Sequence, residues 1–337
     1  MKAAVLGAVG IDNLAVVDVP DPAAPGPGEV LVRLRAASLN YRDLVTAEGG
    51  YGRRQRTANL TLLSDGAGEV VSVGVGVTRF RAGDRVFGVL FPDWLDGGLT
   101  AEAMADTLGG TLDGVGCELR LFPERGLVAM PDGLSFVEAA TLPVAAITAW
   151  SAIVTQGRVA PGDVVLTQGT GGVSLFALQF AKLAGAEVIV TSSSDEKLAK
   201  ARALGADHAI NYATTPEWSR PARAVTGGRG VDHIVELGGG GTLEQSLRAV
   251  RVGGTLSLIG VLAGAAAEVP LGRVVTQNVR LQGVTCGSRR EVEAMARAIA
   301  LAGLRPAVDR VFPLTEIRAA LEWLRAGRHF GKVCVEI

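Results

Sequence analysis

A glycine-rich turn is the part of the sequence whose residue types and spacing point most directly to chemistry. The strand-like run VVLT at residues 164–167 is followed by Gln168-Gly169-Thr170-Gly171-Gly172-Val173-Ser174, which opens a helix-like run. Glycines at such a turn let backbone N–H groups approach a pyrophosphate at the positive end of the helix. Ser174 stands at the third glycine position, where we expect its small side chain to be accommodated. The turn predicts a dinucleotide site.

The residues after the next strand-like run indicate which dinucleotide is bound. Sites specific for NAD place an acidic residue about 20 positions beyond the turn, against the ribose hydroxyls. This sequence has Thr191-Ser192-Ser193-Ser194 instead. Hydroxyls can donate to a 2′-phosphate, and Lys197 can supply a cation, so we predict NADP(H) over NAD(H). If Asp195 faces the ribose instead, the preference reverses.

The elements that must position this turn follow from periodicity. Between residues 164 and 262, apolar strand-like runs alternate with Ala- and Leu-rich helical periods, which predicts an α/β domain with a doubly wound parallel sheet. From residue 1 to about 91, short β-branched runs are broken by Pro and Gly clusters, which indicates a β-barrel-like region. The tail after Pro270 is too short for a core of its own, and we expect it to return to the N-terminal region. The predicted domains are therefore 1–125 with 268–337, and 126–267.

Two segments carry further expectations. TAEAMADTL at residues 100–108 has a helical pattern inside the 92–112 insertion, which can be either a loop over an active-site mouth or a packing flap. The apolar run at 255–262 is expected to end the parallel sheet and pair with its twin in a homodimer.

Composition excludes several classes of function. The chain has 337 residues, 48% of them hydrophobic, and a formal net charge of −1, so nucleic acid and charged membrane surfaces are not expected partners. Cys117, Cys286 and Cys334 show neither chelate spacing nor a disulfide framework, which favours a reducing cytoplasm. No apolar run reaches the ~20 residues of a membrane-spanning helix.

Short motifs spread over the whole chain carry a family resemblance. They are Leu39-Asn40-Tyr41-Arg42-Asp43 with Gly49 and Tyr51, Asp65-Gly66-Ala67-Gly68-Glu69-Val70, Gly83-Asp84-Arg85-Val86, the turn at 168–174, Leu204-Gly205-Ala206-Asp207 with Asn211-Tyr212, and Gly331-Lys332-Val333. The sequence resembles the medium-chain dehydrogenase/reductase superfamily, specifically its zinc-independent, quinone oxidoreductase-like branch. The resemblance implies a GroES-like β-barrel catalytic domain and a Rossmann cofactor domain.

Zinc-dependent members of that superfamily carry a Cys motif and a Gly-His-Glu motif. Here residues 40–43 and 65–68 stand at those places, and His208, His233 and His329 lie far away in sequence. Zn²⁺ needs three or four N, S or O ligands, so we predict no metal and assign the histidines to surface or structural roles.

The resemblance also implies which residues contact the cofactor. Beyond the Gly169–Val173 turn, Ser192, Ser193, Lys197 and Tyr212 are expected near the adenosine ribose. Backbone or side chains are expected to line the nicotinamide side or the phosphates at Thr148, Gly238, Ile259, Gly260, Val261, Thr285, Cys286, Arg289 and Lys332, the last two as candidates near phosphate.

Without a Lewis acid, the easier reaction is hydride delivery to a quinone or to the β-carbon of a conjugated carbonyl, where charge spreads onto oxygen. Asn40 and Tyr51 can donate hydrogen bonds to that oxygen and Asp43 can orient them. The resemblance implies that Tyr51 stands where enoyl-thioester reductases carry a Tyr associated with protonation, although solvent can also supply the proton.

Other functions remain open. They are a metal-free alcohol or aldehyde dehydrogenase, an enoyl-thioester reductase that uses Arg53, Arg54 and Arg56 for a phosphorylated carrier, and a non-catalytic NADP(H)-binding protein.

Overall fold

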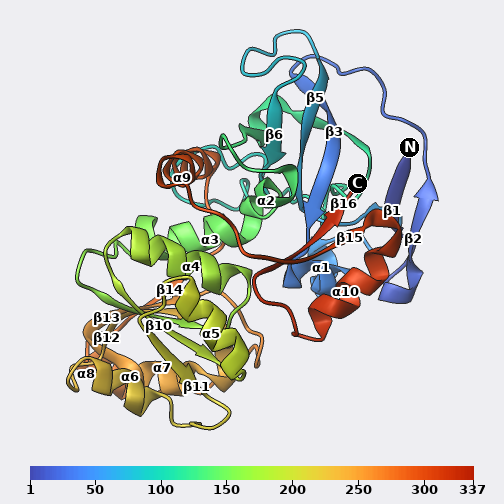
Figure 1. Ribbon diagram of the computed structural model, residues 1–337. Helices are drawn as coiled ribbons and strands as arrows, with labels where there is room; N and C mark the ends of the chain where they lie inside the picture. Colours follow the sequence, from blue (N-terminus) through green and yellow to red (C-terminus); the bar gives the residue numbers. More distant parts are fainter. The chain divides into compact units, whose positions relative to one another are not determined.

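The computed structural model describes residues 1–337, and its chain divides into two units with different architectures. Met1–Ile147 with Cys286–Ile337 forms one unit, called here the barrel unit, and Thr148–Thr285 forms the other, called the parallel-sheet unit. The sequence order of the elements is coloured from blue to red in Figure 1.

Alternating apolar residues build the central strand of the barrel unit, β3 (Glu29–Ser38). Val30, Val32 and Leu34 are buried, whereas Arg33 and Arg35 between and beyond them are exposed, which is the two-residue period of a strand with one face on a core. The sheet around β3 has the order β15-β16-β3-β5-β6-β8, and β7 also pairs with β3. The other strands of this sheet are β5 (Asp65–Val73), β6 (Arg85–Gly88), β7 (Leu119–Pro123), β8 (Leu127–Ala129), β15 (Val308–Pro313) and β16 (Lys332–Glu336).

A second, three-stranded sheet and several helices complete the barrel unit. The sheet has the order β2-β1-β4 and comprises β1 (Lys2–Leu6), β2 (Leu14–Asp18) and β4 (Leu60–Thr61). The helices are α1 (Tyr41–Ala47), α2 (Phe136–Ala139), α9 (Arg289–Ala302) and α10 (Ile317–Arg325), with the short 3₁₀ turns η1 (Ile11–Asn13), η2 (Gly52–Arg54), η3 (Glu124–Gly126) and η7 (Leu314–Glu316).

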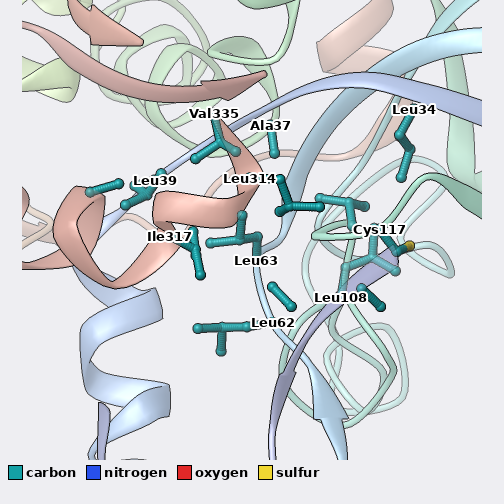
Figure 2. Packing of buried hydrophobic residues seen from close by; sticks show 14 of the residues in the cluster. Leu34, Ala37, Leu39, Leu62, Leu63, Leu108, Cys117, Leu314, Ile317 and Val335 are labelled. Atoms are coloured by element: carbon teal, nitrogen blue, oxygen red, sulfur yellow. The ribbon is translucent and has the colours of Figure 1, made fainter. Parts of the chain in front are cut away.

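The C-terminal tail completes the core of the barrel unit. Leu314 and Ile317, from η7 and α10, belong to the same buried cluster as Leu62 and Leu63, and Figure 2 shows these side chains gathered together. Antiparallel pairing of β16 with β3 fixes the tail in the sheet. The tail from Cys286 onward therefore lies with the N-terminal region.

The parallel-sheet unit has six parallel strands in the order β11-β10-β9-β12-β13-β14. The strands are β9 (Val164–Gln168), β10 (Glu187–Ser192), β11 (His208–Asn211), β12 (Val231–Glu236), β13 (Val250–Leu258) and β14 (Arg280–Gly283), and the connecting helices are α4 (Gly172–Leu183), α5 (Asp195–Ala203), η6 (Gly239–Gly241), α6 (Ser219–Val225), α7 (Leu243–Ala249) and α8 (Leu271–Thr276). Every residue of β9 and β12 is buried, as expected when helices cover both faces of a parallel sheet. This strand order is the doubly wound order of Rossmann domains.

The units divide the chain later than the predicted boundaries at 125/126 and 267/268. Residues 126–147 belong to the barrel unit because α2 and the π-helical turn η4 (Leu142–Ala146) pack on its strands β3 and β5. Residues 268–285 belong to the parallel-sheet unit because β14 pairs with β13.

Two local expectations were wrong. Residues 100–108 form turns rather than a helix, because hydroxyl groups of Thr100 and Thr111 bond backbone atoms nearby. The 255–262 run does not end the sheet, since Arg280–Gly283 pairs beside it as the true edge strand.

One helical run is longer than the apolar stretch seen in the sequence. Phe136–Thr155 is 20 residues long and includes α3 (Ile147–Trp150) and the π-helical turn η5 (Ser151–Thr155), and an 18-residue window within it has a mean hydropathy of 1.6. It is long and apolar enough to cross a membrane, but 72% of that window is buried within the protein, as in a core helix.

Candidate active site

Strand pairing in the barrel unit brings together four polar side chains that are far apart in sequence. Ser38, near the end of β3, pairs with Asp65 of β5 on one side and with Cys334 of β16 on the other. The start of α1, the start of β5 and the start of β16 therefore meet at the same place. Asn40, Asp43, Asp65 and Lys332 lie there, with side chains at least nine-tenths buried. We call these four residues the polar cluster.

Asn40 and Asp43 form the end of the cluster at α1. The Asp43 carboxylate accepts a hydrogen bond from the Asn40 backbone N–H at 2.7 Å, so it fixes the chain where α1 begins. Its other oxygen lies 3.6 Å from the Arg42 guanidinium. Burial raises the pKa of Asp43 to about 6, against the opposing effect of the Arg42 charge. Asp43 therefore titrates far closer to neutrality than an exposed aspartate.

Asp65 and Lys332 form the other end of the cluster. The Lys332 ammonium donates to the Leu39 carbonyl and to Asn40 Oδ1, each at 2.6 Å, and lies 3.9 Å from the Asp65 carboxylate. Asp65 also accepts from the Ser64 hydroxyl at 2.7 Å. Burial lowers the pKa of Lys332 and raises the pKa of Asp65, while the charge of each opposes the shift of the other.

Tyr51 lies beside the cluster rather than inside it. Its side chain is 41% exposed, and its backbone N–H donates to the Gln55 side chain at 3.0 Å. Partial burial raises the pKa of the phenol above its ordinary value, and the charges of Arg42 and Asp43 shift that pKa in opposite directions. The structure therefore places Tyr51 within electrostatic reach of Asp43, with its phenol protonated at neutral pH.

The residues expected at the cofactor lie at one edge of the parallel sheet. Parallel strands end on the same edge, and ligands of doubly wound sheets bind outside those carboxyl ends. The expected residues directly follow or end successive strands: Gly169–Val173 after β9, Ser192 and Ser193 at β10, Tyr212 after β11, Gly238 after β12, Ile259–Val261 after β13 and Thr285 after β14.

The glycine-rich turn has the backbone that a phosphate site requires. Gly169 has a φ of 75°, a left-handed conformation that disfavours other residues, and Gly171 precedes the first residue of α4 without a capping side chain. Because Gly171 offers no side chain to cap the N–H groups at the start of α4, these groups fit a pyrophosphate. Ser174 is buried, and its hydroxyl donates to the Gln168 carbonyl at 2.6 Å, so the turn accommodates this departure from glycine.

Side chains after β10 were expected to select the dinucleotide. Ser192 is buried and Ser193 is exposed, and the Ser192 carbonyl accepts from the Tyr212 backbone N–H at 3.0 Å. The Asp195 carboxylate accepts from the Asn211 side-chain amide at 2.8 Å. The competing carboxylate therefore has a partner on β11.

A buried network that was not predicted from the sequence joins the turn to the loop after β12. The Glu236 carboxylate accepts from the Gln168 amide at 2.7 Å, from the backbone N–H groups of Gly238 and Gly239 at 3.0 Å each, and from the hydroxyls of Thr242 and Ser246. Gln168 Oε1 in turn accepts from the Gly238 N–H at 3.1 Å. The signal in the sequence that could have indicated this network is a polar residue at the end of each of two strands, Gln168 of β9 and Glu236 of β12.

Four expected cofactor residues lie outside that edge or are already engaged. Arg289 begins α9 in the barrel unit, where its backbone N–H donates to the Trp94 carbonyl at 2.9 Å and its guanidinium lies 3.4 Å from Glu293. Lys332 was expected near phosphate, but its ammonium is buried against Asn40 and Leu39 instead. Thr148 and Cys286 are buried at the points where the chain passes between the units.

The three histidines are dispersed. His208 contacts Glu187, and His233 is buried against the Ser257 hydroxyl at 3.1 Å, with its pKa lowered to about 4 by burial. No group of three or more His, Cys, Asp and Glu side chains that could hold a metal ion occurs in the structure. The residues present therefore do not fit a tetrahedral zinc site.

Comparison with known proteins places these features in a family. Residues 26–132 match the family model of the alcohol dehydrogenase GroES-like domain, and residues 172–301 match that of the zinc-binding dehydrogenase. A zinc-type alcohol dehydrogenase-like protein of Schizosaccharomyces pombe is 43% identical over 97% of this chain and 96% of its own length. The chain belongs to the medium-chain dehydrogenase/reductase superfamily. It is an NAD(P)H-dependent oxidoreductase.

Other relatives of this oxidoreductase carry different names. A quinone oxidoreductase of Pseudomonas aeruginosa is 33% identical over 92% of the chain and 91% of its own, and an acryloyl-coenzyme A reductase of Metallosphaera sedula is 29% identical over 94% and 95%. The crystal structure of a putative alcohol dehydrogenase from Sinorhizobium meliloti superposes with a TM-score of 0.94, at 44% identity over 100% of this chain and 98% of that one. The GroES-like and Rossmann fold predicted from the sequence is confirmed.

Proposed function

We propose that this oxidoreductase works without zinc and uses NADPH to reduce a quinone or an α,β-unsaturated carbonyl compound. The observation that carries the proposal is the polar cluster. Asn40, Asp43 and Asp65 stand where zinc-dependent members carry the Cys and Gly-His-Glu motifs, and the Lys332 ammonium group lies against Asn40 at 2.6 Å. An amide donor beside a buried cation suits an oxygen that gains negative charge during the reaction.

The cluster residues would act on the substrate oxygen and on one proton. When bound, the dihydronicotinamide supplies a hydride to the substrate carbon. Asn40 would donate a hydrogen bond to the oxygen on which charge then collects, and Asp43 would hold the Asn40 backbone in place at 2.7 Å. Tyr51 would give its phenolic proton to the reduced product and regain it from solvent, since its phenol is protonated at neutral pH and 41% exposed.

The preference for NADPH rests on the end of β10. Ser192 and Ser193 offer hydroxyls where NAD-specific sites carry an acidic side chain, so a 2′-phosphate would meet no like charge there. Lys197 lies in the first turn of α5, and the Asp195 carboxylate is engaged by Asn211 at 2.8 Å. We propose that the remaining expected residues at the sheet edge bind the rest of the cofactor.

Steady-state kinetics with chelator-treated protein test this proposal. Oxidation of NADPH and of NADH would be followed at 340 nm against quinones, α,β-unsaturated ketones, enoyl thioesters and simple aldehydes. We expect turnover with the first two classes and a higher kcat/KM for NADPH. Dependence on added zinc would contradict the metal-free assignment, turnover of simple aldehydes alone would contradict the substrate assignment, and a clear NADH preference would overturn the cofactor assignment.

An enoyl thioester is the second candidate substrate. Arg53 and Arg54 are exposed in η2, directly after Tyr51, where they could meet the phosphates of a carrier. Arg56 is less suited than expected, because it pairs with Asp113 at 3.0 Å. If this candidate is correct, a double variant with Arg53→Ala and Arg54→Ala should show a raised KM for an enoyl thioester and an unchanged KM for the other acceptors in the same assay.

A further inference from the structure

Lys332 is a buried charged residue whose role the proposed reaction leaves open. It is the first residue of β16, its side chain is 3% exposed, and its ammonium makes two hydrogen bonds at 2.6 Å, to the Leu39 carbonyl and to Asn40 Oδ1. Taking an ammonium group out of water is costly unless its contacts offset the loss. A buried lysine that contacts a candidate active-site amide therefore calls for an explanation beyond packing.

The Lys332 contact determines which way the Asn40 amide faces. An ammonium group has only donors, so the amide atom against it must be the oxygen. The amide nitrogen is then directed elsewhere. Asn40 Nδ2 is buried and has no hydrogen-bond partner, and its nearness to the Asp65 carboxylate opposes part of the rise that burial causes in the pKa of Asp65.

Asn40 is consequently held at two points. Asp43 fixes its backbone N–H at 2.7 Å, and Lys332 fixes its side-chain oxygen at 2.6 Å. A side chain held in this way loses little further freedom when its nitrogen binds an acceptor, which is the condition for effective stabilisation of developing charge.

We propose that Lys332 is a positioning residue that orients the Asn40 amide so that its nitrogen donates to the substrate oxygen. This inference rests on the proposed reduction of a carbonyl or quinone acceptor. It gives Lys332 a role different from phosphate binding, and it makes the effect of Lys332 on turnover depend on the presence of Asn40.

A double-mutant cycle tests this dependence. Asn40→Ala, Lys332→Met and the double variant would be compared by kcat/KM for the best acceptor, with NADPH affinity measured by fluorescence titration. Loss of an oxyanion donor lowers rates by about 10²-fold or more, so we expect each single variant to lose about that much while NADPH binding is retained. The double variant should be no slower than Asn40→Ala alone. Lys332→Arg, which keeps donors at the site, should recover part of the rate lost in Lys332→Met.

Two controls keep the result interpretable. Lys182→Met removes another lysine that pairs with a carboxylate, Asp207 at 2.8 Å, on a different unit, and it should leave turnover unchanged. If Lys332→Met does not fold because Asp65 loses its partner, the same cycle would be run in an Asp65→Asn background, where that carboxylate carries no charge.

The outcomes separate this inference from the proposed function. Full activity of Asn40→Ala would remove Asn40 as a donor and overturn both. If Asn40→Ala is slow and loss of Lys332 then lowers its rate by the same factor as in the Lys332→Met single variant, the positioning role alone is overturned. Loss of NADPH affinity in Lys332→Met, with turnover at saturating cofactor unchanged, would return Lys332 to phosphate binding.

Discussion

Tyr51 differs from the residues of the polar cluster because solvent reaches it. Its side chain is 41% exposed, whereas Asn40, Asp43, Asp65 and Lys332 are almost completely buried. A proton donor must be re-protonated after each turnover, and an exposed phenol can exchange with water directly. At the residue scale, the buried groups therefore suit the charge on oxygen and Tyr51 suits the proton.

Removal of the Tyr51 hydroxyl tests this division of roles. Tyr51→Phe keeps the ring and should lower kcat by about 10²-fold or more, the usual contribution of a general acid, while NADPH binding stays nearly the same. Single-turnover kinetics and fluorescence titration would measure the two effects. Unchanged turnover would remove Tyr51 from the mechanism and leave the proton to solvent.

Asp43 should make stability depend on pH in a defined direction. Burial raises its pKa from 3.8 to about 6, so the folded protein favours the protonated carboxyl. Below the pKa of the unfolded state, Asp43 is protonated in both the folded and the unfolded state. Between that pKa and the pKa of the folded state, Asp43 is protonated only in the folded state. The free energy of unfolding should therefore fall as pH rises through this window, by about 3 kcal/mol from this group.

The difference between the protein and Asp43→Asn isolates this effect from other titrating groups. Arg42, Asp65 and Lys332 face Asp43 in both proteins, and the asparagine keeps an oxygen that can accept the Asn40 N–H. Denaturant unfolding at several pH values between about 4 and 7 would give the two curves. Parallel curves would contradict the raised pKa.

Part of the site could be predicted from the sequence. Asn40, Asp43 and Tyr51 lie within one short segment, and their donor chemistry follows from residue type. The place of Lys332 could not be predicted, because it depends on the pairing of β16 with β3, which joins residues almost 300 positions apart. The resemblance named Lys332 and gave it a different role.

At the scale of elements, the Gln168–Glu236 contact joins two strand ends that serve the cofactor edge. Gln168 directly precedes the glycine-rich turn, and Glu236 bonds the N–H groups of the loop that follows β12. The side chains of two residues thus determine the relative placement of two predicted cofactor-binding segments. This placement lies within one unit and is independent of the substrate.

Gln168→Leu should weaken cofactor binding without removing any cofactor contact proposed above. The variant loses the hydrogen bonds to Glu236 and Gly238 and leaves a buried carboxylate short of one donor, which costs about 1–3 kcal/mol. We expect NADPH affinity to fall about 10-fold and thermal stability to decrease. Gln156→Leu is the matched control, since Gln156 bonds only the nearby Ser151 before β9 and should not affect affinity. Equal affinities would show that the network serves stability alone.

Predictions of element type were correct where periodicity was strong and wrong where side chains compete with the backbone for hydrogen bonds. The alternation of strands and helices predicted the parallel sheet correctly. The helical pattern at 100–108 did not, because threonine hydroxyls at 100 and 111 hold that segment in turns. The edge of the sheet was also misassigned, because residues 268–285, which include β14, were predicted to return to the N-terminal region with the rest of the tail.

At the scale of the whole molecule, the β14 edge is where we expect a second subunit. One side of this strand has no neighbour in the chain, and exposed apolar side chains occur close to it in sequence: Val261 (55%), Leu262 (56%), Leu271 (68%) and Val275 (72%). Apolar groups beside an open strand edge favour association. We therefore expect the homodimer interface at β14 and the segments near it, rather than at the 255–262 run alone.

Light scattering coupled to size exclusion would test the dimer. The mass should be twice the 34.7 kDa of one chain, and Val275→Glu should lower it towards a single chain by placing a charge at an exposed apolar position just before β14. Leu301→Glu, at a position 90% exposed on α9 of the barrel unit, should leave the mass unchanged. A single-chain mass for the unaltered protein would refute the homodimer.

Transfer of isotope from cofactor to product tests the proposed zinc-free hydride transfer. Chelator-treated protein with its metal content measured would be given NADPH deuterated at C4 of the nicotinamide and an α,β-unsaturated ketone, and the product would be analysed by mass spectrometry and NMR. We expect one deuterium at the β-carbon, a proton from the enzyme or water at the α-carbon, and the same rate with or without added zinc. A product without deuterium, or activity that appears only with zinc, would contradict it.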